Sequence, residues 1–134
     1  EDAAALLDGG YDYVLDCIDT VAPKVALLAA CQHRGVKVIS SMGAGGRIDP
    51  SKTVITDLWE TTNDGLARAV RQRLRKAGLR RRLPVVASTE LPHTASLIEI
   101  GAENKRTSYG TIAPLPATFG IFMASYVIND LISE

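Results

Sequence analysis

Hydrophobic residues recur along the chain with two spacings, and the two kinds of stretch alternate. Short runs rich in valine, isoleucine and tyrosine, bounded by glycine, proline or serine, are typical of strands. Longer apolar stretches with a capping residue at the start and glycine at the end are typical of helices. The predicted elements are helix 1–8, strand 11–16, helix 21–34, strand 36–41, strand 54–58, helix 66–77, strand 84–88 and helix 119–132.

Strands that alternate with helices predict an α/β fold with a largely parallel sheet. Residues 11–41 form a strand–helix–strand unit in which Thr20 is placed to cap the helix. Strand 84–88 is expected to join the same sheet, and residues 91–110 are expected to be irregular. The apolar tract 111–128 contains two prolines and is short for a membrane span, so we interpret it as a buried helix.

Composition limits the class of protein further. The chain has 134 residues, of which 46% are hydrophobic and 22% charged, so it can fill one core. This excludes a disordered tail and a disulfide-stapled mini-protein. Cys17 and Cys31 lie in apolar runs, where we expect strand-end and core contacts in a reducing setting, and no zinc site. Because the chain starts at Glu1 and directly enters a helical stretch, we interpret it as a piece of a larger protein.

Polar residues gather where the first strand is predicted to end. Asp16 and Asp19 are followed by Thr20 and, one helical turn later, by Lys24. Ligands bind at the carboxyl ends of parallel strands, where a carboxylate can hold Mg²⁺ or a ribose hydroxyl. A helix N-terminus and a lysine both favour phosphate. The alternative is that the acids cap the helix and face water, and that Lys24 is a solvated surface residue.

A glycine run, 43–46, follows the second strand and permits close approach of the backbone to a ligand. It matches neither of the glycine-rich nucleotide motifs, so an ordinary loop is the alternative. The third strand ends in residues 88–90 (STE), which could add a hydroxyl or a carboxylate to the same edge. His33 and His93 have no evident triad partners and stay unassigned.

Charge is distributed unevenly along the chain. Residues 66–83, called the basic segment below, hold eight of the fifteen basic side chains and no acidic one. Arginine suits bidentate contact with phosphate, so the basic segment predicts a polyanionic partner bound by salt-sensitive contacts. The alternative is a solvated helix face. The eight residues are Arg68, Arg71, Arg73, Arg75, Lys76, Arg80, Arg81 and Arg82.

Three motifs together resemble one family. They are residues 11–24 (YDYVLDCIDTVAPK), 43–50 (GAGGRIDP) and 86–90 (VASTE). They resemble the tRNA threonylcarbamoyladenosine dehydratases, a branch of the ThiF/MoeB adenylating superfamily that also contains ubiquitin-activating enzymes. The acid pair is shared across that superfamily, whereas the GAGGRIDP loop is more specific to the dehydratase branch. The resemblance implies a Rossmann-like fold of which residues 1–134 are the C-terminal half.

The resemblance also implies an ATP-dependent reaction on tRNA. The carboxylate of N6-threonylcarbamoyladenosine at position 37 would be activated as an acyl-adenylate. The carbamoyl nitrogen would then close on it, which gives a cyclic hydantoin and releases AMP and pyrophosphate. Asp19 would be the catalytic acid that holds Mg²⁺–ATP, with Asp16, Thr20 and Lys24 as further nucleotide-binding residues. The substrate loop would be Gly43, Ala44, Gly45, Gly46 and Arg47, and the basic segment would bind tRNA.

Relatives in the superfamily usually carry Asn where Thr20 stands, and their glycine-rich phosphate loop belongs to a half outside these residues. The chain alone is therefore expected to bind ATP weakly and to be inactive. One alternative function is adenylation of the C-terminus of a sulfur-carrier or ubiquitin-like protein, against which the basic segment argues. Another is a non-catalytic RNA-binding or scaffold domain.

Assembly and location are implied only by the resemblance. Members are commonly homodimers, and the apolar C-terminal helix could supply that interface. Bacterial members are cytoplasmic, and fungal members are associated with the mitochondrial outer membrane through a segment that would lie outside this chain.

Overall fold

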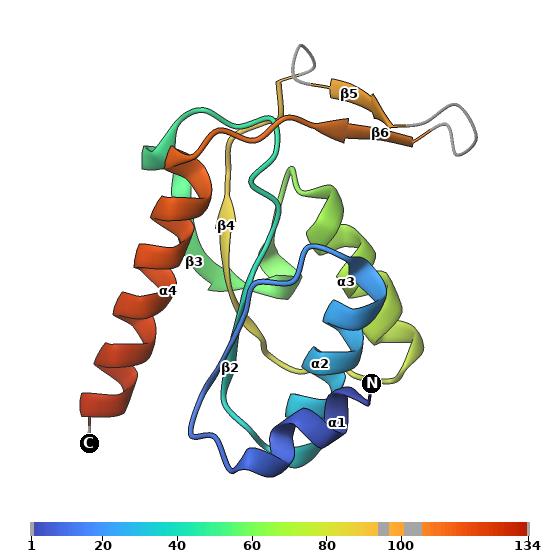
Figure 1. Cartoon of the computed structure of the whole chain (residues 1–134), viewed down its shortest axis with the longest axis vertical. Coiled ribbons are helices and arrows are strands. Elements are labelled where there is room, and N and C mark those ends of the chain that lie inside the picture. The colour runs from blue at the N-terminus through green and yellow to red at the C-terminus, as the bar shows by residue number, and fades with distance from the viewer. Residues whose placement is uncertain (1, 94–96, 101–105, 134) are drawn as a thin grey trace.

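A four-stranded sheet with helices on both faces and a separate two-stranded hairpin make up the molecule (Figure 1). The computed structural model describes residues 2–93, 97–100 and 106–133. The strands are β1 (Val14–Asp16), β2 (Val38–Ser41), β3 (Thr53–Asp57), β4 (Pro84–Ser88), β5 (Leu97–Ile100) and β6 (Arg106–Tyr109). The helices are α1 (Ala3–Leu6), α2 (Val21–Arg34), α3 (Gly65–Lys76) and α4 (Pro114–Ile132), with single 3₁₀ turns η1 (Leu7–Gly9), η2 (Pro50–Lys52) and η3 (Leu58–Glu60).

The sheet is mixed, with the strand order β1-β2-β4-β3. β1 pairs with β2 and β2 with β4 in parallel, whereas β3 runs antiparallel along β4. The prediction of an α/β fold with a largely parallel sheet is therefore confirmed, with one antiparallel strand at its edge. Parallel pairing brings the carboxyl ends of β1, β2 and β4 to one edge of the sheet, where the sequence places its polar motifs.

Alternate residues of the central strands face opposite layers of the core. Val38 and Val85 pack toward α2 and α3, whereas Ile39 and Val86 pack toward α4. Figure 1 shows α4 alone on its side of the sheet and α2 and α3 together on the other. Because both faces of β2 and β4 are covered, these strands are nearly continuous in apolar character.

The two central helices begin in different ways. Thr20 occupies the N-cap position of α2, but its side chain makes no capping hydrogen bond, so the expected side-chain cap is wrong. The Asp64 carboxylate accepts a hydrogen bond from the backbone N–H of Ala67 and caps α3. α2 ends as predicted at Gly35, whose φ of 68° lies in the left-handed region that favours glycine.

α4 begins at Pro114, five residues before the predicted start at Phe119. Proline is tolerated in the first turn because the N–H that it lacks has no intrahelical acceptor there. Leu115, Phe119, Met123 and Val127 form one buried stripe against the sheet. Phe122 and Tyr126 are half-buried beside this stripe, and most other residues of α4 are exposed, so the expected buried helix is buried on one side only. By length and composition α4 could also cross a membrane, a test that core helices of soluble proteins pass as well.

The prediction that residues 91–110 are irregular is wrong in part. β5 and β6 pair in antiparallel register from Leu97–Tyr109 to Ile100–Arg106 and form a hairpin that extends from the sheet (Figure 1). Residues 94–96 and 101–105 lie outside the described residues, so the prediction stays untested there. β5 and β6 pair with each other and with no strand of the four-stranded sheet.

Candidate functional site

A cavity of about 480 Å³ lies at the carboxyl edge of the sheet. Segments that are distant in the sequence form its walls: the residues after β1, the glycine run after β2, the start of α3 and the start of α4. The residues that line it are Cys17, Asp19, Ser41, Met42, Gly43, Ala44, Gly45, Arg47, Asp64, Gly65, Leu66, Pro92, Thr111, Pro116 and Phe119. Two motifs predicted to act together, the strand-end acid and the glycine run, thus face one space.

Asp19 is the acid of the predicted pair that reaches this cavity. Its side chain is exposed and lines the cavity wall. Within the described part of the chain, its carboxylate makes no hydrogen bond or ion pair, so both oxygens are available to a ligand. Thr20 is also exposed, but it is not among the residues that line the cavity.

Asp16 and Lys24 lie beneath the cavity in a buried polar network. The Lys24 ammonium is 2.8 Å from Asp16 Oδ2, and both side chains are fully buried. Lys24 Nζ also donates to the carbonyl oxygens of Ile18 at 2.8 Å and Ser41 at 2.7 Å. Asp16 accepts from Ser40 Oγ at 2.6 Å and from the Ile18 N–H at 3.0 Å. The network ties β1 to β2 and to the start of α2.

The alternative that Lys24 is a solvated surface residue is therefore wrong. Its three ammonium protons all have acceptors within the chain, so a phosphate contact would require one of these bonds to break. Asp16 is likewise enclosed and does not line the cavity. The predicted nucleotide contacts of Asp16 and Lys24 stay predictions, and this geometry favours a structural role for both residues instead.

The glycine run is held closely against the start of α3. Asp64 Oδ2 accepts a hydrogen bond from the Gly43 N–H at 3.1 Å. A Cβ at position 43 would lie 3.2 Å from Asp64 Oδ1 and 3.4 Å from Arg47 Nη1, which explains why glycine stands there. The Arg47 side chain is buried and donates to the carbonyl oxygens of Gly45 and Asn63. The predicted substrate loop is thus a braced wall of the cavity.

The two cysteines lie where the sequence places them. Cys31 is in the core, where desolvation, with a smaller contribution from the Asp16 charge, raises the pKa of its thiol. Cys17 lies at the end of β1, and its Sγ is 3.9 Å from Met123 Sδ on α4, as expected for strand-end packing. Cys17 is also exposed and lines the cavity.

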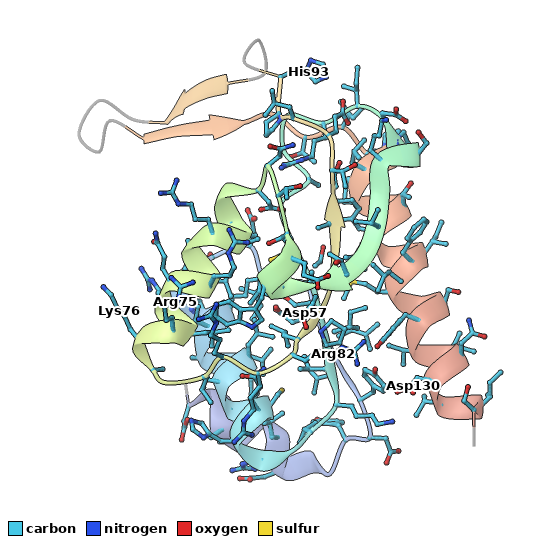
Figure 2. All side chains as sticks on the ribbon, turned by 180° about the vertical axis from the view of Figure 1, so that it is seen from behind. Asp57, Arg75, Lys76, Arg82, His93 and Asp130 are labelled. Atoms are coloured by element: carbon cyan, nitrogen blue, oxygen red, sulfur yellow. The ribbon has the colours of Figure 1, made fainter. Side chains whose placement is uncertain are left out.

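The basic segment combines α3 with the loop that leads to β4, and none of its eight basic side chains is buried. Two of them bind carbonyl oxygens of the chain: Arg71 donates to those of Leu58 and Thr61 and also to the Thr61 hydroxyl, and Arg81 donates to that of Gln32 at 3.0 Å. In the view of Figure 2, Arg75 and Lys76 project from the outer side of α3, and Arg82 lies apart from them beside the sheet. The side chains of the basic segment therefore lie on more than one surface of the molecule.

The ring of Trp59 lies beside two of these arginines. The guanidinium groups of Arg75 and Arg80 lie 5.6 Å and 5.5 Å from the centre of its ring, within the range of cation–π contacts. Trp59 Nε1 donates to the Arg81 carbonyl at 2.8 Å, which ties the loop to η3. Among the described residues, no carboxylate forms an ion pair with any basic side chain of this segment.

Sequence reasoning misses several residues of the site. Asp64 is one of them: one of its carboxylate oxygens caps α3 and the other fixes Gly43. Glu90, from the STE motif, does not line the cavity but contacts the backbone behind the glycine run. In the sequence, the position of Glu90 at the end of β4 is the feature that places it near this edge of the sheet. Its actual partners, Ile48 and Asp49, cannot be inferred from spacing.

The chain is an α/β protein with an exposed strand-end carboxylate that faces a braced glycine loop. Ligands of such proteins, nucleotides among them, bind at this carboxyl edge of the sheet. No protein-family model matches the chain. Its sequence is 47% identical to tRNA threonylcarbamoyladenosine dehydratase 2 of Saccharomyces cerevisiae, over 92% of this chain and 32% of that protein. It is 33% identical to the Bacillus subtilis dehydratase, over 95% of this chain and 53% of that protein.

The fold gives the same result. The chain matches the crystal structure of Escherichia coli tRNA N6-threonylcarbamoyladenosine dehydratase in complex with ATP, with a TM-score of 0.85 and 31% identity, over 98% of this chain and 52% of that one. The chain belongs to the tRNA threonylcarbamoyladenosine dehydratase family. It spans about half the length of the bacterial relatives it matches and about a third of the yeast one.

Proposed function

We propose that this chain is part of an ATP-dependent enzyme that cyclises N6-threonylcarbamoyladenosine at position 37 of tRNA. The observation that carries the proposal is the Asp19 carboxylate, which faces the glycine loop across a cavity in a fold similar to that of an ATP-bound dehydratase. In this reaction the substrate carboxylate attacks the α-phosphate of ATP and pyrophosphate leaves. The carbamoyl nitrogen then attacks the activated carbonyl, loses its proton and expels AMP, so that the base loses one water in total.

The residues of the cavity suit the positioning that this reaction needs. Gly43 and Gly45 allow the backbone to approach a ligand, and Asp64 and Arg47 hold them in place. The buried Asp16–Lys24 pair fixes the turn that presents Asp19. We assign Asp19 to the nucleotide and residues 43–47 to the modified base.

Mg²⁺ would bind at Asp19 if it accompanies ATP. Mg²⁺ in nucleotide enzymes is commonly held by one or two carboxylates together with phosphate oxygens and water. Asp19 fits this pattern because its oxygens have no partner in the described chain, whereas both Asp64 oxygens accept backbone hydrogen bonds. Among the described residues no group of three or more His, Cys, Asp or Glu side chains could hold a metal ion. The metal would neutralise charge on the phosphates.

The basic segment would bind the phosphate backbone of tRNA. Its exposure and its lack of ion pairs among the described residues support this assignment. Arg71 and Arg81 already bind carbonyl oxygens of the chain, so we assign phosphate contact mainly to the remaining six residues.

Assembly and location are further proposals. The outward side of α4 exposes Ile121, Ile128 and Ile132, at 68%, 57% and 73% of their surface, and could form a homodimer interface. The resemblance described above implies a location for each source. A fungal protein would be associated with the mitochondrial outer membrane, and a bacterial protein would be cytoplasmic. Cell fractionation of the full-length protein would test the location.

ATP–pyrophosphate exchange tests the substrate class. The full-length protein would be given ATP with either threonylcarbamoyl-modified tRNA or a sulfur-carrier protein. We expect exchange to depend on the modified tRNA and not on the carrier. Exchange that is stimulated only by the carrier would support the sulfur-transfer alternative and contradict the proposal.

A further inference from the structure

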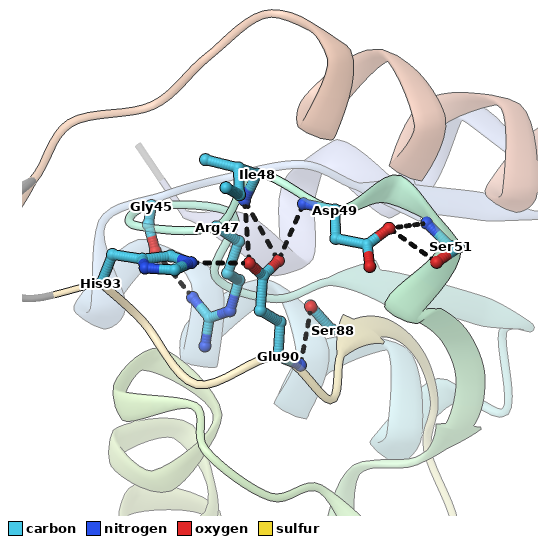
Figure 3. Close-up of polar contacts among 8 residues, drawn as sticks. All are labelled: Gly45, Arg47, Ile48, Asp49, Ser51, Ser88, Glu90 and His93. Atoms are coloured by element: carbon cyan, nitrogen blue, oxygen red, sulfur yellow. Dashed lines mark hydrogen bonds and ion pairs between the residues drawn. The ribbon is translucent and has the colours of Figure 1, made fainter.

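Glu90 lies two residues beyond β4, and its carboxylate is almost enclosed, with 13% of the side chain exposed. It accepts hydrogen bonds from the backbone N–H of Asp49 at 2.9 Å and from that of Ile48 at 3.1 Å. Its other oxygen, Oε1, lies 2.9 Å from His93 Nε2. Figure 3 shows the carboxylate between these three partners. One side chain therefore joins the end of β4 to the segment 46–49.

The backbone N–H groups of segment 46–49 have few partners other than Glu90, although the buried Arg47 side chain braces the loop from within. The segment belongs to neither a helix nor a strand, so no regular ladder fixes it. Besides the bonds to Glu90, the Gly46 carbonyl accepts from the His93 N–H at 2.7 Å, and the Gly46 N–H donates to the Gly110 carbonyl at 2.9 Å. At the other end, Asp49 accepts from the Lys52 N–H through its carbonyl and from Ser51 through its carboxylate. Removing the Glu90 carboxylate would leave two backbone N–H groups without their acceptor.

The opposite side of the same loop forms the cavity wall. Gly43, Ala44, Gly45 and Arg47 line the cavity, whereas Glu90 does not. Arg47 immediately precedes the two residues whose N–H groups Glu90 holds. A shift of Ile48 would therefore move Arg47 and, through its bond to the Gly45 carbonyl, the loop in front of it.

The charge of Glu90 strengthens this clamp. Hydrogen bonding from the Asp49 N–H, followed by that from His93 and Ile48, lowers the pKa of Glu90 below its ordinary value, although desolvation opposes the shift. The carboxylate is thus ionised near neutral pH. Hydrogen bonds to an ionised acceptor are shorter and stronger than those between neutral groups.

We propose that Glu90 is a positioning residue: through the Ile48 and Asp49 amides and His93 it fixes the loop that presents the modified adenosine to the nucleotide held at Asp19. The proposal rests on the function given above, because residues 43–47 are assigned there to the substrate. Nucleotide binding at Asp19 does not require this clamp. The consequence is a selective loss of turnover of the tRNA, with ATP affinity retained.

The clamp itself is tested by amide hydrogen exchange in the full-length protein. Glu90→Gln keeps the shape of the side chain but replaces one acceptor oxygen with an NH₂ group. We expect exchange at Ile48 and Asp49 to accelerate by about tenfold or more. Asp12→Asn is the matched control, because it also removes one carboxylate charge but lies before β1, exposed and away from the loop. Unchanged exchange in Glu90→Gln would overturn the proposal.

Kinetics test the consequence. For Glu90→Gln we expect kcat/KM for modified tRNA to fall on the order of 10- to 100-fold, with the affinity for ATP and the melting temperature close to those of Asp12→Asn. His93→Gln, which keeps the backbone bond to Gly46, is expected to have a smaller effect. Accelerated exchange with unchanged kcat/KM would also overturn the proposal. A wild-type protein that does not cyclise the base would contradict the proposed function. Amide hydrogen exchange at Ile48 and Asp49 would still show whether Glu90 holds the loop in place.

Discussion

Asp16 and Lys24 show how a single pair of residues can support a site without entering it. Both are fully buried, and Lys24 Nζ bonds to Asp16 and to two backbone carbonyl oxygens. A buried ion pair contributes little compared with well-packed apolar residues, but the loss of one partner leaves an uncompensated charge. The turn between β1 and α2 therefore depends on both residues.

Lys24→Met should lower the free energy of unfolding by about 3–5 kcal/mol, because Asp16 keeps a buried charge without its cation. Lys37→Met provides the control: Lys37 pairs with Asp130 at 3.0 Å, but the two side chains are 60% and 37% exposed, so we expect a loss of about 0–1 kcal/mol. Urea unfolding of the full-length protein would measure both values. Equal losses in the two variants would show that the Asp16–Lys24 pair is not structurally important.

Residue roles were predictable where spacing alone decides them. Asp19 lies three residues after the end of β1, so its place at the carboxyl edge of the sheet could be expected. The role of Lys24 could not, because its partners include the Ser41 carbonyl on another strand, which only the three-dimensional fold brings close. The same reason hid the contacts of Glu90 with Ile48 and Asp49, whose positions depend on tertiary structure.

Among the elements, α4 combines two different surfaces. The stripe that includes Met123 packs on β2 and β4, whereas Ile121 faces outward and is 68% exposed. Prolines at positions 114 and 116 suggested a later start of this helix, although both fit its first turn, where the missing N–H groups have no intrahelical acceptor. The strands of the sheet were predictable from their branched residues, but the hairpin β5–β6, which pairs with no strand of that sheet, was not.

The two surfaces of α4 can be separated by mutation. Met123→Ala should lower the free energy of unfolding by about 2–5 kcal/mol, because it leaves a cavity against the sheet. Ile121→Asp should change it by less than about 0.5 kcal/mol but should weaken the proposed homodimer. Chemical unfolding and sedimentation velocity would measure the two effects. A dimer that persists unchanged in Ile121→Asp would exclude this side of α4 as the interface.

For the whole molecule, the distribution of charge along the chain matters more than the net charge, which is zero. The basic segment carries eight positive charges with no acid, and the structure holds Arg75 and Arg80 against Trp59 on an exposed surface. A stacked guanidinium loses less freedom when it binds a phosphate than a mobile one does. We therefore expect these two arginines to contribute more to tRNA affinity than their number suggests.

The double variant Arg75→Ala/Arg80→Ala should weaken tRNA binding and reduce the slope of log K against log salt by about 0.7–0.9 for each phosphate that the variant no longer binds. Arg34→Ala/Lys37→Ala removes the same charge outside the basic segment, where each side chain already pairs with an aspartate. We expect this control to keep the slope of the wild type. Fluorescence anisotropy over a range of salt concentrations gives both quantities, and equal slopes in the two variants would mean that Arg75 and Arg80 do not bind phosphate.

Conversion of the modified base is the measurement that most directly tests the proposed dehydratase function. The full-length protein would be incubated with threonylcarbamoyl-modified tRNA and ATP, and the nucleosides would be analysed by mass spectrometry. We expect the base at position 37 to lose the mass of one water in an ATP-dependent manner, with AMP and pyrophosphate released in equal amounts. Asp19→Asn should lose most of this activity while the fold is retained, because its side chain is exposed. Modified tRNA that remains unchanged in the presence of the wild-type protein and ATP would contradict the proposal.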